Sequence, residues 1–347
     1  MERAARTRRF AVLAIGAIGA IGSLLGALVP TTARAATLIG LLPSPASEAL
    51  LLSVDCANDG SGEPASMTVQ IRDLGPALAP VVSLQARRNF AAKSTTDGID
   101  ADGTASPVVI LNEGAGRYDL YVDKNGAGEE AFEVVAQCWT GPNGTGSATG
   151  TTLRSAQGEP VPTLLPPAGI GLLGLSLALA MAELRARPRS TRPLDRSDSR
   201  SALLLLALMV GGLAWLAPAV AGAHSQPGSL GTPASATDYY EIACFDDGHG
   251  QPGSLELQIR DASPGAAPFV SVQGHHGLTV RSVSDDLLAD ILPSPRIFLN
   301  GGAVSYFVLV DKSGAGGKFY DLTYHCWTGP DGTGVHTGTS LIIRQSE

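Results

Sequence analysis

The chain has 347 residues, a formal net charge of −8 and an aromatic content of 5%. That length leaves room for two domains of about 100 residues and for additional apolar segments. The acidic balance argues against a phosphate-binding surface, which needs clustered Lys and Arg, so we expect no nucleic-acid partner.

Residues 1–35 have the pattern of a secretory signal peptide. Four arginines within the first nine residues precede an uncharged apolar run from Phe10 to Val29, and Ala33 and Ala35 supply small residues for cleavage after Ala35. The alternative is an uncleaved membrane anchor. Both interpretations predict that the rest of the chain is exported.

Residues 36–158 and 224–347, here called the first and second repeat, are two copies of one sequence. Their cysteines are equally spaced, and each residue of the first copy has its counterpart 188 positions later (244 − 56). Three motifs recur without a gap, beginning at Gln70, Val122 and Cys138 in the first repeat. Each repeat is therefore expected to be one folded unit.

The even cysteine count predicts one disulfide in each repeat, because thiols outside the cytoplasm are normally oxidised. The expected pairs are Cys56–Cys138 and Cys244–Cys326, each 82 positions apart. The chain has no further cysteine for thiolate catalysis.

Alternating apolar and polar residues predict that the repeats are built from β-strands. Met67, Val69 and Ile71 alternate with polar neighbours, and the same pattern recurs around Tyr118 and Phe132 and at the matching places of the second repeat. The Gly-rich segment 123–128 suggests a hairpin turn between the last two strands. The expected fold class is all-β: two tandem antiparallel β-sandwiches of roughly seven strands, Ig-like in architecture, linked by two transmembrane helices.

Those helices are expected at 160–182 and 201–223, where two uncharged runs would each span about 34 Å as a helix. Residues 183–200 between them carry six arginines, which predicts a cytoplasmic loop with both repeats facing outward. The alternative is a pair of buried helices, which the lack of a polar face disfavours. The second run also has the features of another signal peptide, with a cleavage site after Ala223.

The first of these runs resembles a known sorting signal. A Val-Pro-Thr-Leu sequence starting at Val161, an apolar run and a basic stretch from Arg185 to Arg189 are similar to the IPTL-CTERM signal of exported proteins in Gram-negative bacteria. Val161 replaces the usual Ile, and the signal is internal instead of terminal. The resemblance implies exosortase-type processing by a sorting protease and delivery to the envelope or an exopolysaccharide layer.

Carboxylates shared by both repeats are the candidate metal ligands. Calcium prefers several oxygen ligands, and a loop rich in Asp could supply them if the fold brings the side chains together. The candidates are Asp97, Asp102 and Asp123 in the first repeat and Asp285, Asp290 and Asp311 in the second. Solvated loop carboxylates explain the same residues, so the sequence predicts no cofactor beyond this calcium site.

Other chemistry finds little support in the sequence. All six histidines lie beyond residue 223, and their spacing matches no common zinc pattern, which favours scattered surface histidines. A Gly-x-Gly-x-x-Gly match at 169–174 has no preceding strand, and no nucleophile elbow occurs. A His-containing triad common to both repeats is excluded because the first repeat has no histidine.

The sequence therefore predicts a non-enzymatic, exported and membrane-anchored protein with a structural or binding role at the bacterial envelope. Its expected location is the inner membrane with both repeats periplasmic, or the cell surface or medium after processing. Expected partners are the membrane, envelope polysaccharide or protein, and the sorting protease. Two alternatives stay open: a secreted carboxylate-based hydrolase or calcium-dependent carbohydrate binder, and two sorted proteins fused in one frame.

Overall fold

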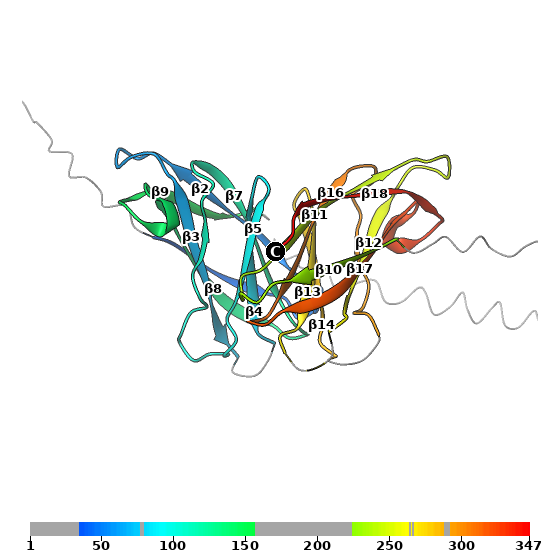
Figure 1. Cartoon of the computed structure of the whole chain (residues 1–347), viewed down its shortest axis with the longest axis horizontal. Coiled ribbons are helices and arrows are strands. Elements are labelled where there is room, and N and C mark those ends of the chain that lie inside the picture. The colour runs from blue at the N-terminus through cyan, green and yellow to red at the C-terminus, as the bar shows by residue number, and fades with distance from the viewer. Residues whose placement is uncertain (1–34, 77–79, 157–223, 264, 266, 288–291) are drawn as a thin grey trace, which may run out of the picture. The chain divides into compact units, whose positions relative to one another are not determined.

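The computed structural model describes residues 35–156 and 224–347, apart from 77–79, 264, 266 and 288–291. Each repeat forms one nine-stranded antiparallel unit, coloured blue to green for the first and yellow to red for the second in Figure 1. Apart from one three-residue 3-10 turn in each repeat, Pro142–Gly144 and Pro330–Gly332, the described elements are strands.

The first repeat joins its strands in the order β5-β4-β7-β2-β9-β8-β3-β6. β1 pairs with residues 130–136 of β8, next to the stretch of β8 that pairs with β9. The strands of this repeat are β1 (Ala36–Leu42), β2 (Leu50–Ala57), β3 (Ser66–Gly75), β4 (Val82–Arg88), β5 (Ala91–Thr96), β6 (Val109–Leu111), β7 (Gly116–Lys124), β8 (Glu130–Trp139) and β9 (Ala148–Ser155).

The second repeat has the same order, β14-β13-β16-β11-β18-β17-β12-β15, with β10 paired to β17. Its strands are β10 (His224–Leu230), β11 (Asp238–Phe245), β12 (Ser254–Asp261), β13 (Val270–His276), β14 (Thr279–Asp285), β15 (Ile297–Leu299), β16 (Ser305–Lys312), β17 (Lys318–Trp327) and β18 (His336–Gln345).

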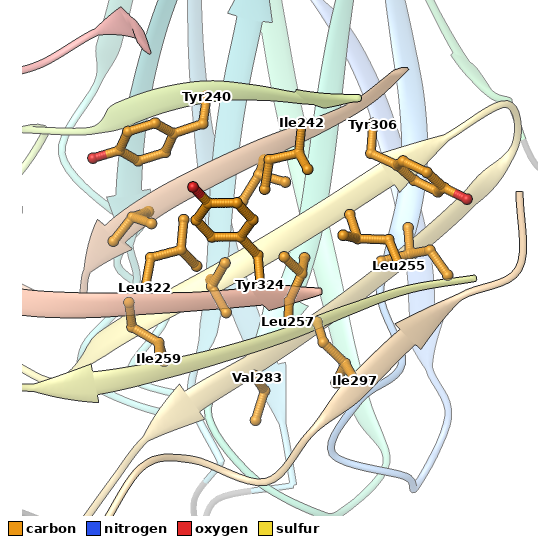
Figure 2. Packing of buried hydrophobic residues seen from close by; sticks show 14 of the residues in the cluster. Tyr240, Ile242, Leu255, Leu257, Ile259, Val283, Ile297, Tyr306, Leu322 and Tyr324 are labelled. Carbon is orange, nitrogen blue, oxygen red and sulfur yellow. The ribbon is translucent and has the colours of Figure 1, made fainter. Parts of the chain in front are cut away.

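Each repeat is a two-layer sandwich around one apolar core. In the first repeat, β9 pairs with β8 near its start and with β2 over the rest of its length, so it passes from one layer to the other. The predicted alternation places Tyr118, Leu120 and Val122 of β7 in the core. Figure 2 shows the equivalent packing in the second repeat, where Tyr306 and Ile242 lie among aliphatic side chains. Each fully buried aliphatic side chain contributes roughly 1.5–3 kcal/mol.

Both predicted disulfides are formed. Cys56 on β2 is bonded to Cys138 on β8, and Cys244 on β11 is bonded to Cys326 on β17. Each bond therefore joins the two layers of its sandwich.

The segment after β7 is not the hairpin turn that its glycines suggested. β7 pairs with β2 and β4, whereas β8 pairs with β1, β3 and β9, so the chain crosses between layers at 125–129. Gly-rich composition permits a reversal of the chain but does not specify which strands pair. The repeated Val-Asp-Lys motif closes β7: Val122 enters the core, and the buried Lys124 ammonium donates to the carbonyls of Pro43 and Gly128.

A third apolar cluster joins the two repeats. Leu51 and Tyr121, on the β2 and β7 faces that point away from the first core, pack with Tyr239 and Leu309 of the second repeat. Two backbone hydrogen bonds cross the junction in a symmetric pair, from Ser94 N to Ser235 O at 3.4 Å and from Ser282 N to Ser47 O at 3.3 Å. These four serines correspond under the duplication, so the repeats are related by an approximate two-fold axis.

Cutting the chain between Ala156 and His224 should leave the two repeats associated. The interface buries apolar side chains on both partners, and exposing Leu51, Tyr121 or Leu309 to water costs roughly 1.5–3 kcal/mol for each side chain. A protease site placed in this segment should yield two fragments that co-elute in gel filtration. Separate elution at micromolar concentration would contradict the interface.

The predicted link of two transmembrane helices is wrong as a description of this fold. No helix in the described part of the chain has the length and apolar character that a bilayer span requires. Residues 160–182 and 201–223, the Arg-rich segment 183–200 and residues 1–34 of the predicted signal peptide lie outside the described residues. The all-β class is confirmed, with nine strands in each repeat instead of seven.

Candidate functional site

Three carboxylates of the first repeat meet at one end of its sandwich. Asp73 lies near the end of β3, Glu130 begins β8, and Asp100 lies in the connection from β5 to β6. One carboxylate oxygen from each lies within 4.8 Å of the others. Asp73 and Glu130 are each only 1% exposed.

These carboxylates have few partners for groups so deeply buried. One oxygen of Asp73 and both oxygens of Asp100 and Glu130 are buried with no hydrogen-bond partner among the described residues. Burial, with the nearby carboxylates of Asp73 and Asp100, raises the pKa of Glu130 to about 7. Burial is also the main cause that raises the pKa of Asp73. Because a buried unpaired carboxylate is costly, the cluster is suited to a positively charged ligand.

In the second repeat, a lysine ammonium neutralises the aspartate that corresponds to Asp73. Asp261 corresponds to Asp73, and Lys318 corresponds to Glu130. The Lys318 ammonium contacts Asp261 Oδ2 at 2.6 Å, with both side chains buried. In the first repeat, the matching Asp73 Oδ2 has no partner among the described residues. In the second repeat, the positive charge beside the aspartate therefore comes from the Lys318 side chain.

The two positions share one backbone hydrogen bond. Asp73 Oδ1 accepts from Gly75 N at 3.0 Å, and Asp261 Oδ1 accepts from Ser263 N at 2.8 Å. The first repeat therefore holds Asp73 as the second repeat holds Asp261, and it has the Glu130 carboxylate where the second repeat has the Lys318 ammonium. Clustered carboxylate oxygens are the ligands that Ca²⁺ prefers, so these residues fit a hard divalent cation.

The carboxylates selected from the sequence do not converge within the first repeat. Asp97 Oδ2 accepts a hydrogen bond from Asp73 N at 2.8 Å, so Asp97 contacts the backbone of a cluster residue. Asp102 is exposed and accepts from Thr104 N. Asp123 points from β7 into the junction between the repeats. In the second repeat Asp285 supports Asp261 at 2.6 Å, and Asp290 lies outside the described residues.

Asp123 and Asp311 meet each other across the two-fold axis. The Gln85 amide nitrogen donates to Asp123 at 3.1 Å and to Asp311 at 2.9 Å, and the Gln273 amide nitrogen donates to the same two carboxyls at 2.9 and 3.1 Å. Burial, followed by the neighbouring Asp123, raises the pKa of Asp311 to about 7, and burial raises that of Asp123. The pair cannot carry two full charges without cost.

Three of the six histidines gather on the second repeat instead of being scattered. The ring of His325 on β17 lies 4.6 Å from that of His336 and 6.0 Å from that of His224, measured between centroids. Burial and the two neighbouring rings lower the pKa of His325 to about 4. Within the described residues, the only group of three or more ligands that could hold a metal is the acidic cluster, so these histidines are best described as a packed aromatic patch with Trp327.

The acidic cluster could have been found by asking where the repeats differ. Glu130 is not among the carboxylates shared by both repeats, because its counterpart is Lys318, a reversal of charge at a matched position. Asp73 belongs to the shared Gln-Ile-Arg-Asp motif, but nothing local in the sequence shows that its carboxylate is buried.

Comparisons with known proteins identify no family for this chain. No protein-family model matches the sequence, and no curated protein matches it. Among solved structures, vicilin from Corylus avellana (hazelnut) is similar at 10% identity, over 88% of this chain and 77% of that chain, with a TM-score of 0.19. At that TM-score the likeness supports neither a shared fold nor a shared function.

Proposed function

We propose that this is an exported, non-catalytic binding or structural protein of two paired β-sandwiches, stabilised by a divalent cation, with Ca²⁺ as the favoured ion. The signal-like N-terminus and one disulfide in each repeat support export to an oxidising compartment. The observation that carries the proposal is the cluster of Asp73, Asp100 and Glu130 with its unpartnered oxygens.

Burial favours a structural role for this cluster over hydrolysis. A carboxylate that acts as a general acid or nucleophile must reach its substrate, and Asp73 and Glu130 are each 1% exposed. Asp123 and Asp311 are equally buried between the repeats. A cation reaching the cluster instead joins three separate elements of the first repeat, and its binding energy adds to the stability of the folded state.

Calcium should raise the unfolding temperature of the full-length chain, and this effect should depend on Glu130. At a free concentration of 100 times Kd, binding to the folded state alone stabilises by about 2.7 kcal/mol. Glu130→Lys copies the second repeat, so its ammonium should replace the ion. We expect this variant to lose the calcium response and to unfold no more easily than the wild type in EDTA.

Asp102→Asn is the matched control, because Asp102 is exposed and lies outside the cluster. It should keep the full calcium response in thermal unfolding and in calorimetric titration. The response should be larger at pH 8 than at pH 6, because protons compete with the ion for a carboxyl whose pKa is about 7. A wild type that ignores calcium, or a Glu130→Lys variant that responds like it, contradicts the proposed site.

A further inference from the structure

A cavity of about 560 Å³ opens on the approximate two-fold axis between the repeats. Six of its eight lining residues form three pairs of counterparts, one member from each repeat. The pairs are Arg87 with His275, Asn89 with Gly277 and Asp119 with Phe307. Ligand sites commonly lie between domains and have volumes of roughly 300–1,000 Å³.

The positively charged side chains of this cavity all come from the first repeat. The two lining residues without a counterpart in the cavity are Arg88 and Arg117, so the first repeat supplies three guanidinium groups. The matching residues of the second repeat are His275, His276 and Ser305. In a chain with a net charge of −8, three arginines around one cavity form a local positive site.

Arg87 is held rigidly at the cavity wall. Its guanidinium donates to Asp119 at 2.6 Å and to the Tyr239 hydroxyl at 2.6 Å, and it lies 4.3 Å from the centre of the Phe307 ring. Asp119 also accepts from Arg117 Nε at 3.1 Å. One carboxylate is therefore shared by two guanidinium groups, which leaves positive charge on the cavity side.

Arg88 and Arg117 carry that remaining charge. Arg88 donates to the backbone carbonyls of Gly114 and Ala115, which orient its guanidinium but do not neutralise it. The Arg117 side chain is 53% exposed, and its contact with Asp119 uses Nε. Because Arg117 is held through Nε, its terminal N–H groups remain available to match the two oxygens of a carboxylate or phosphate. Each terminal nitrogen of Arg88 already donates one N–H to a carbonyl and retains a second.

We propose that this cavity between the repeats binds a small anion bearing a carboxylate or phosphate group, with Arg117 and Arg88 as its ligands. The site requires both repeats, because His275, Gly277 and Phe307 complete the wall. It is independent of the cation cluster, which is built from the first repeat alone.

Titration of the full-length chain with inorganic phosphate, galacturonate and neutral galactose tests the proposal. Calorimetry should detect binding of at least one anion, weakened when NaCl rises from 50 to 500 mM, and no binding of galactose. Binding of phosphate alone assigns a phosphorylated ligand, and binding of galacturonate alone assigns an acidic saccharide. Absence of binding by both anions, or equal binding of galactose, overturns the proposal.

Substitutions that introduce the residues of the second repeat test whether the anion binds in this cavity. Arg117→Ser and Arg88→His introduce the residues found at the matching positions, and Arg117→Ser should weaken anion binding at least tenfold. Arg154→Gln is the control, because it removes one exposed arginine from β9, outside the cavity lining. Arg117 is more than half exposed, so its variant should keep the unfolding temperature of the wild type. Equal weakening by Arg117→Ser and Arg154→Gln would show a nonspecific charge effect and overturn the assignment.

Discussion

Stability is expected to fall as the pH rises from 5 to 9, because the Asp123–Asp311 pair cannot ionise fully between the repeats. Burial and the facing carboxyl raise the pKa of Asp311 to about 7 from an ordinary value of 3.8. In the unfolded chain both carboxyls lose their protons near pH 4. The folded state therefore binds more protons between these values, and its stability declines with pH.

The expected loss is large. A shift of about three pKa units corresponds to roughly 4 kcal/mol, all of it present below pH 4 and lost by pH 8. Chemical denaturation at pH 5, 7 and 9 measures the part of this loss that occurs above pH 5. The double variant Asp123→Asn/Asp311→Asn should have a flatter profile and exceed the wild type in stability at pH 9, with the single variants between them.

Glu130 also contributes to the pH dependence of stability and has to be substituted, because its pKa rises to about 7. Carrying out the series in the Glu130→Lys background removes the contribution of Glu130, and the difference between variants within that background measures the pair between the repeats. Asp102→Asn in the same background is the charge-matched control and should leave the profile unchanged. If the double asparagine variant keeps the steep loss between pH 5 and 9, the pair is not its source.

Removal of either disulfide should be the most destabilising change in its repeat. Each bond closes a loop of 82 positions and ties the two layers of a sandwich together. The chain-entropy estimate for such a loop is about 4–5 kcal/mol, and removal of native disulfides typically costs about 2–5 kcal/mol. The pairs Cys56→Ala/Cys138→Ala and Cys244→Ala/Cys326→Ala should lose similar amounts, because their spacing and placement are equal.

The two losses should also be coupled. Unfolding of one repeat exposes Leu51 and Tyr121, or Tyr239 and Leu309, which the other repeat covers. Urea denaturation of the two double variants should show one shared transition at a lower midpoint. Two separated transitions, with the intact repeat keeping its original midpoint, would contradict energetic coupling through the interface.

The sequence was most informative where structure depends on local spacing. Alternation with a period of two placed Met67, Val69 and Ile71 in the core, because successive side chains of a strand point to opposite faces. The equal offset between the cysteines identified the duplication, and the oxidising compartment expected from residues 1–35 predicted both disulfides.

The outer faces of the central strands were harder to interpret. Leu50, Leu51 and Leu52 form an apolar run, as do Val308, Leu309 and Val310, and such runs indicate strands buried on both sides. A strand of an isolated sandwich buries only one face, and in this protein the interface between the repeats buries the other face of β2 and β16. The run shows that a second face is buried but not what covers it.

Residue spacing was enough to predict the duplication, the strand faces and the cysteine pairing, because each follows from position along the chain or from the two-residue period of a strand. Which strands share a layer depends on tertiary packing, which makes residues 125–129 a crossover and Asp123 of β7 an interface residue. Tertiary packing also decided that Asp73, Asp100 and Glu130 meet, although 57 positions separate the outer two (130 − 73). Burial and convergence depend on the whole packed sandwich, which no local pattern records.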